Sequence, residues 1–142
     1  MDVAVASLVN VVQGHLVSKR RPVRYGNAHP SIVPYRDFRT ADQPIVVAIG
    51  NSRHWTALCS ALDLERWGKD PLVATNDARV RNREGVEAVL QGKFENQSRA
   101  HWIDCLRRAG VPAGPVNTTI GLVATDAQLT KEDANYLARV SQ

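Results

Sequence analysis

Apolar residues recur every three or four positions in three parts of the chain, which is the spacing of one face of an amphipathic helix. The first stripe follows the Gly50-Asn51-Ser52 break, which suits a helix cap, and consists of Trp55, Leu58, Cys59 and Leu62. The second predicts a helix from about Arg83 to Asn96, whose expected inward residues are Val86, Val89, Leu90 and Phe94. The third predicts a helix from about Ser98 to Ala109, ended by Gly110 and Pro112, whose expected inward residues are Trp102, Cys105, Leu106 and Ala109.

Two short apolar runs precede these helices and predict strands. They span Val33–Phe38 and Pro44–Ile49 on either side of Thr40–Gln43, so we expect an antiparallel hairpin. Because Ile45 to Ile49 is continuously apolar, we expect the second strand to be buried on both faces. With helices in the majority, the pattern predicts an α+β fold in which a small antiparallel sheet is packed against several helices.

Both ends of the chain carry further helical patterns. Asp2–Ser18 is apolar on almost every face, and a helix of this kind belongs inside something larger. It follows Asp2 rather than a basic segment, so it is not typical of a secretion signal, and we expect a cytoplasmic protein. No run of 18 apolar residues occurs, so we expect no membrane span. Near the C-terminus, Thr130-Lys131-Glu132-Asp133 has the pattern of a capping box and predicts a helix.

Basic residues form a cluster within residues 19–39 of this 142-residue chain, whose net charge is +4. Such a cluster either meets phosphate, on nucleic acid or a nucleotide cofactor, or forms a solvated loop. The segment Lys19–Arg24 lacks interleaved aromatic residues apart from Tyr25, which follows it, so we expect no nucleic-acid partner. Cys59 and Cys105 are expected to be buried, reduced thiols. The basic residues of the cluster are Lys19, Arg20, Arg21, Arg24, Arg36 and Arg39.

The common motifs for phosphate, dinucleotide and metal binding are absent from the sequence, so we expect no metal and no tightly bound cofactor. His29 lies in a loop rich in Gly and Pro. It either touches a bound thioester or acyl group, or hydrogen-bonds a neighbouring carbonyl to fix the loop. Arg79 and Arg83 would share one helical face, where they either bind a carboxylate or phosphate or pair with the local acids Asp77 and Glu87.

A series of short motifs follows one another in a fixed order along the chain. They are Gly26–Tyr35 (GNAHPSIVPY), Phe38-x-Thr40-Ala41-Asp42, Ala48–Asn51 with Trp55, Asp70-Pro71, Thr75–Arg83, Trp102 and Gly110–Asn117 (GVPAGPVN). From about Asp2 to Thr118 the chain resembles the small domain of the family III CoA-transferases. The resemblance implies three parts: residues 1–19 as a helix continuing from a large domain, 20–118 as the small domain, and 119–142 as a divergent tail with a helical end.

The activity implied by this resemblance is transfer of coenzyme A between an acyl-CoA thioester and a carboxylic acid. In that family an aspartate carboxylate attacks the donor thioester, which divides the exchange into easier covalent steps. The family's nucleophile should lie before Asp2, so we assign no catalytic residue and expect a truncated chain that is inactive alone. A loop that shields the intermediate corresponds to Gly26–Pro30. The implied substrate contacts are Gly26, Asn27, His29, Pro30 and Tyr35.

The resemblance also indicates which branch of the family the chain belongs to and which chains it associates with. Arg39 stands where the family's acyl-CoA racemases carry a catalytic glutamate, which argues against the racemase branch. Chains of that family interlock as dimers, so the resemblance implies a homo-oligomer or association with a large domain. The alternative is a non-catalytic module that docks on a full-length CoA-transferase, which the apolar first helix motivates.

Overall fold

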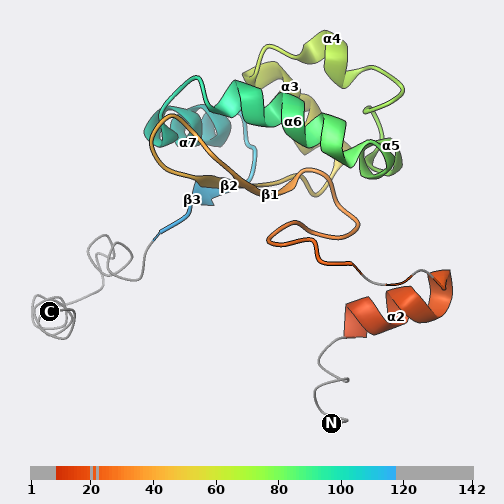
Figure 1. The fold of residues 1–142 in the computed structure, drawn as a ribbon. Helices are drawn as coiled ribbons and strands as arrows, with labels where there is room; N and C mark the ends of the chain where they lie inside the picture. The colour runs from red at the N-terminus through yellow and green to blue at the C-terminus, as the bar shows by residue number, and fades with distance from the viewer. Residues whose placement is uncertain (1–8, 20, 22, 118–142) are drawn as a thin grey trace, which may run out of the picture.

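The computed structural model describes residues 9–19, 21 and 23–117 (Figure 1). The first part of the expected N-terminal helix, the expected helix at Thr130–Asp133 and the tail from residue 118 lie outside the described residues. Among the residues that are described, no helix is both long enough and apolar enough to cross a bilayer. The elements are α2 (Val9–Ser18), β1 (Tyr35–Phe38), β2 (Ile45–Ala48), α3 (Ser52–Ala61), α4 (Glu65–Gly68), α5 (Asn76–Arg81), α6 (Arg83–Phe94), α7 (Arg99–Arg108) and β3 (Ala113–Pro115).

The predicted hairpin is present, within a three-stranded antiparallel sheet of order β1-β2-β3. β1 begins at Tyr35 rather than at Val33, because Val33 N–H donates to the Asn76 side chain and Val33 C=O accepts from Arg79 instead of joining the ladder. The third strand was not predicted. Its Pro115 lacks a donor, which a sheet tolerates here because β3 is an edge strand.

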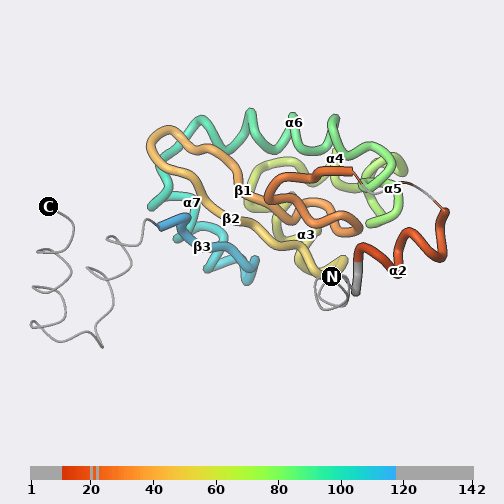
Figure 2. The backbone as a smooth tube through the Cα atoms, turned by 60° about the horizontal axis from the view of Figure 1, so that its bottom comes forward, coloured from red at the N-terminus to blue at the C-terminus, as the bar shows by residue number. Residues whose placement is uncertain are grey.

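One face of the sheet packs against the helices and the other does not (Figure 1). Along β2, Ile45 and Val47 are fully buried whereas Val46 and Ala48 are only partly buried. The expectation that this strand is buried on both faces is therefore wrong, because the helices form a single layer. Figure 2 shows α6 running along the β1 side of the sheet and α7 beside β3.

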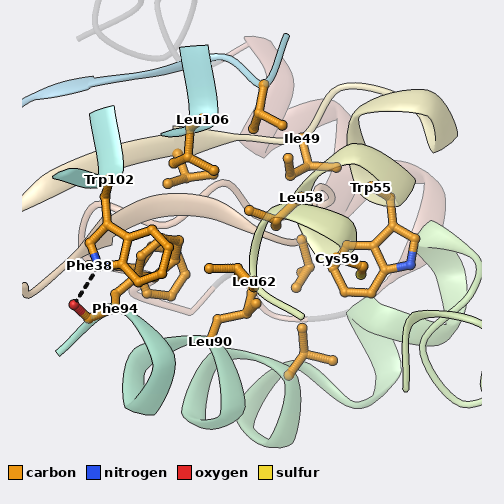
Figure 3. Close-up of a cluster of buried hydrophobic side chains, with 14 of the residues drawn as sticks. Phe38, Ile49, Trp55, Leu58, Cys59, Leu62, Leu90, Phe94, Trp102 and Leu106 are labelled. Atoms are coloured by element: carbon orange, nitrogen blue, oxygen red, sulfur yellow. Dashed lines mark hydrogen bonds between the residues drawn. The ribbon is translucent and has the colours of Figure 1, made fainter. Parts of the chain in front are cut away.

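The core joins the buried face of the sheet to the helical stripes (Figure 3). Phe94 lies between Phe38, at 5.1 Å between ring centroids, and Trp102, at 5.4 Å. The Trp102 Nε1–H donates to Phe94 C=O at 2.8 Å, so the large ring is buried with its polar atom satisfied. The first stripe is confirmed in full, since its four residues are all buried: Trp55, Leu58, Cys59 and Leu62.

Two of the expected inward residues are exposed. Val89 is 37% exposed, since α6 buries a narrow stripe spaced by four residues and Val89 lies at its border. Ala109 is exposed because α7 has already ended at Arg108 and Ala109 is its C-cap. Gly110 follows in the left-handed conformation at φ +69°, which confirms it as the stop. Cys105 is partly buried and, like Cys59, is a free thiol.

Helix α2 stands apart from this core. Three of its apolar side chains are exposed, with Val11 at 45%, Leu16 at 59% and Val17 at 80%. In Figure 1 it lies on the side of the sheet away from α3, α6 and α7. Its neighbours include the loop that contains His29, and together they line one hollow.

Candidate functional site

The loop of residues 25–31 is folded by its own backbone and then pinned to the edge of β1. Gly26 adopts φ +60°, a conformation that L side chains rarely take, and Ala28 N–H donates to Tyr25 C=O at 3.0 Å. His29 N–H then donates to Tyr35 C=O at 2.9 Å. The loop therefore has a defined shape and lies directly against the first strand.

His29 is the ionisable residue at the centre of this loop. Its ring stacks on Tyr35 at 5.3 Å between centroids and 11° between planes. Nδ1 accepts from Ser31 N–H at 3.2 Å, which places the proton of the neutral ring on Nε2. Nε2 has no partner among the described residues. The ring thus fixes the loop, by accepting from an amide rather than by donating to a carbonyl, and keeps one free donor.

Arg83 holds this loop from the first turn of α6. Its Nη2 donates to both His29 C=O and Pro30 C=O at 2.9 Å, and its Nη1 lies 3.1 Å from Glu87. Tyr25 covers the guanidinium at 5.3 Å. The expected pairing of Arg83 with a local acid is confirmed for Glu87. One planar cation therefore joins the loop to a helix more than fifty residues later in the sequence.

Arg79 does not share this site, although the spacing placed it on the same face as Arg83. The helix breaks at Asn82 between α5 and α6, and the two side chains have different partners. Arg79 is 2% exposed and donates to the carbonyls of Val33, Val73 and Ala74. Of the two alternatives for this pair, the structure therefore does not support a ligand site shared by both arginines, and Arg79 also forms no salt bridge with an acid among the described residues.

Two hollows flank Pro30. One, of about 630 Å³, lies between α2 and residues 29–31. The other, of about 660 Å³, lies between Tyr25 and the junction of α5 and α6, and its lining includes the charged residues Arg81, Arg83 and Glu84. His29 lines the first hollow and Pro30 lines both, whereas Gly26 and Asn27 are exposed on the loop and line neither. Tyr35 supports the His29 ring and is 39% exposed.

The basic cluster is divided in the structure. Arg36 Nη1 lies 2.7 Å from Glu87, and Arg39 Nη2 lies 3.2 Å from Glu95. Arg21 and Arg24 are exposed. Among the described residues of the cluster, those without a carboxylate partner therefore lie in the segment that leads into the His29 loop.

Three residues that organise the loop were not identified as such from the sequence. Asn76 Nδ2 donates to Ser31 C=O at 2.8 Å and Asn76 Oδ1 accepts from Val33 N–H, so this side chain fixes the far end of the loop. Arg83 and Glu87 were noted only as a local pair. The signal in the sequence was only that arginine and asparagine recur in Asn76–Arg83, and nothing in it connects this segment to the loop.

Comparison with known proteins identifies the family of the chain. The family model described as CoA-transferase family III matches residues 1–139, and the chain belongs to this family. That match runs past the motifs recognised above, which end at Asn117. The small three-stranded sheet with its helical layer is thus the fold of part of a family III CoA-transferase.

Individual relatives agree with this assignment. The chain is 36% identical to succinyl-CoA:glutarate CoA-transferase of Homo sapiens over 113 residues, which are 80% of this chain and 26% of the relative. It is 32% identical to acetyl-CoA:oxalate CoA-transferase of Acetobacter aceti over 115 residues, 81% of this chain and 30% of the relative. Among solved structures, a CAIB/BAIF family protein from Brucella suis superposes with a TM-score of 0.72 at 37% identity, over 85% of this chain and 32% of that one. The chain spans less than a third of each of these relatives.

Proposed function

We propose that this chain provides the small domain of a CoA-transferase that moves CoA between an acyl-CoA thioester and a carboxylic acid. The observation that carries the proposal is the loop of residues 25–31, which belongs to a chain of this family, is clamped by Arg83 and presents the free Nε2–H of His29. Acyl-CoA and the acid are its substrates, and no tightly bound cofactor takes part.

The reaction proceeds by acyl exchange on a carboxylate. An aspartate carboxylate attacks the acyl carbon of the donor and displaces CoA thiolate, which gives a mixed anhydride. The thiolate then attacks the aspartyl carbonyl, so the donor acid leaves and an enzyme thioester remains. The acceptor carboxylate reverses both steps and takes CoA. We propose that this aspartate is supplied from outside the 142 residues, in a dimer or with a large domain, in the cytoplasm.

The role proposed for the loop is to cover the intermediate and exclude water. A mixed anhydride or enzyme thioester is hydrolysed easily, so a rigid cover preserves it. Gly26 and Asn27 let the backbone approach the acyl group without a large side chain, and Pro30 stiffens the loop. The Nε2–H of His29, held in place by Tyr35 and Ser31, donates a hydrogen bond to the acyl oxygen.

Complementation tests this function. A full-length relative lacking the segment that matches residues 1–118 is mixed with the 142-residue chain and supplied with acyl-CoA and acid. We expect transferase activity to return, and His29→Ala to lower kcat by roughly tenfold to a hundredfold. His101→Ala, on the exposed face of α7, is the matched control. Failure to restore activity, or an aspartyl hydroxamate formed in this chain alone with acyl-CoA and hydroxylamine, contradicts the proposal.

The exposed α2 supports a second candidate function, a non-catalytic module that docks on an intact CoA-transferase. Leu16 and Val17 would then be covered by the partner rather than by solvent. Size-exclusion chromatography with and without a complete relative distinguishes the two. Docking predicts a complex that Leu16→Ser weakens and that Leu72→Ser, an equally exposed leucine at 64%, does not. A lone monomer in both runs excludes this second function.

A further inference from the structure

A separate, smaller hollow of about 180 Å³ lies where α3 begins. Its lining holds several hydrogen-bond donors and no acidic side chain. This composition does not suit a cation, and it is unlike the hollows beside Pro30, which it does not share a residue with. The lining residues are Ile32, Ile49, Gly50, Asn51, Ser52, Asn76 and Arg79.

Arg79 gives this hollow a buried positive charge. The residue is 2% exposed, one face of its guanidinium lies over Trp55 at 4.3 Å, and none of the salt bridges among the described residues includes it. Burial lowers the pKa of Arg79, but an arginine remains protonated at neutral pH. A buried charge without a counter-charge is unfavourable, so the site lacks a negative group.

One nitrogen of this guanidinium remains available. Nε donates to Val33 C=O at 2.6 Å, and Nη1 is shared between two carbonyls of the loop before α5 at 3.0 Å each. Nη2 has no acceptor among the described residues. Nη2 is also not fully enclosed. In the described part of the chain, the side-chain polar atom that is both fully enclosed and without a partner is Nδ1 of His54.

The start of α3 adds donors to the same hollow. Asn51 is the N-cap and its Oδ1 accepts from His54 N–H at 2.9 Å, whereas its Nδ2 amide group has no partner in the described part of the chain. The first N–H groups of a helix have no acceptor within the helix, and they form the positive end of its dipole. The helix is ten residues long, so this end is well formed.

We propose that this hollow binds the carboxylate of a small organic acid, with Arg79 Nη2 and the start of α3 as its donors. The single uncompensated guanidinium matches the single charge of a carboxylate, and the planar anion suits a planar donor. Binding here does not require CoA or the loop at His29, so it stands independently of the transferase function.

A titration of the 142-residue chain tests the proposal. The chain is titrated with acetate, and with neutral acetamide as control, at constant ionic strength while the Trp55 indole N–H is followed by NMR. Trp55 reports on the site because the guanidinium lies over its ring. We expect saturable shifts with acetate at an affinity on the order of millimolar, and none with acetamide.

Arg79→Ala removes bonds that hold three backbone carbonyls and therefore threatens folding, so a milder variant decides the matter. Asn51→Asp keeps a good N-cap and adds a negative charge at the hollow. We expect it to weaken acetate binding at least tenfold. Ser98→Asp makes the same kind of change at the N-cap of α7, away from Arg79, and should leave binding unchanged. Absence of saturation, equal shifts with acetamide, or equal affinity in Asn51→Asp overturns the proposal.

Discussion

The side-chain amide of Gln91 pairs with both backbone polar groups of Arg39. Its Nε2–H donates to Arg39 C=O at 2.9 Å, and its Oε1 accepts from Arg39 N–H at 3.2 Å. A residue of α6 thus satisfies the backbone N–H and C=O groups that follow β1, as a neighbouring strand would. Since β1 is an edge of the sheet, this contact also occupies part of an edge on which another chain would otherwise pair.

Replacing Gln91 by Ala is expected to lower the free energy of unfolding by about 1–2 kcal/mol, because two backbone groups lose their partner. Urea unfolding measures the change. Gln97→Ala, an exposed glutamine in the turn before α7, is the control and should shift the midpoint little. Equal midpoints for the two variants would show that the amide pairing contributes nothing.

Gly68 is expected to tolerate no side chain. A Cβ built there lies 2.5 Å from Cys59 Sγ and 2.9 Å from Cys59 Cβ, within the core. Gly68→Ala should therefore destabilise by about 1–3 kcal/mol through overpacking. Gly92→Ala provides a control of opposite sign, since Gly92 lies open on α6 and alanine there should stabilise by about 0.5–1 kcal/mol. Thermal unfolding of both variants checks the signs.

Arg83→Lys is expected to loosen the His29 loop while keeping the charge. Lysine lacks the fork that reaches two carbonyls and Glu87 at once. Hydrogen exchange at the Ala28 and His29 amides should become about tenfold faster, as expected for a loss near 1.4 kcal/mol. Arg81→Lys, exposed on α5, should leave both amides unchanged. If both variants exchange alike, the clamp is not what orders the loop.

Asp42 makes stability depend on acid pH. Hydrogen bonds from the Arg99 amide, the Thr40 hydroxyl and the Gln43 amide lower its pKa from 3.8 to about 2. A carboxyl whose folded pKa is depressed stabilises above its unfolded pKa and loses that contribution as pH falls through the folded value. The urea concentration at the unfolding midpoint should therefore decrease as the pH is lowered from 4 to 2. The decrease should be less steep in Asp42→Asn. Parallel slopes would contradict this assignment.

The two thiols should differ in reactivity. Burial raises the pKa of Cys59 to about 11, so at pH 8 only about a thousandth of it is thiolate, the reactive form. Cys105 is partly exposed. We expect a disulfide reagent to modify Cys105 rapidly in the native protein and Cys59 only on unfolding. In Cys105→Ser the rapid phase should disappear, and its persistence would mean that Cys59 is accessible.

Helix positions were predictable because local signals agree with packing. The stripe from Trp55 to Leu62 is both periodic and buried, and Asn51 and Ser98 cap their helices as their residue types favour. Strand limits were less predictable. Whether Val33 joins a ladder depends on Asn76 and Arg79 far along the chain, and β3 is hidden by Pro112 and Pro115, which normally argue against a strand.

The candidate site was predictable only in part, for a similar reason. A loop of Gly, Asn, His and Pro attracts attention from its composition, and His29 was identified in this way. Its clamp was not, because Arg83 and His29 are 54 positions apart and no spacing pattern connects them. The lack of a carboxylate partner for Arg79 among the described residues is likewise not visible in the sequence, since only the fold shows which acids lie near it.

The place of β3 in the chain has a consequence for biosynthesis. β2 bonds on one side to β1, which has already been made, and on the other to Ala113–Pro115, which follows helices α3 to α7 in the chain. While a ribosome is still translating α3 to α7, the Ile45–Ala48 backbone has one open edge. A nascent polypeptide stalled before residue 113 therefore presents an apolar strand to neighbouring polypeptides, and chaperones should engage it at that stage.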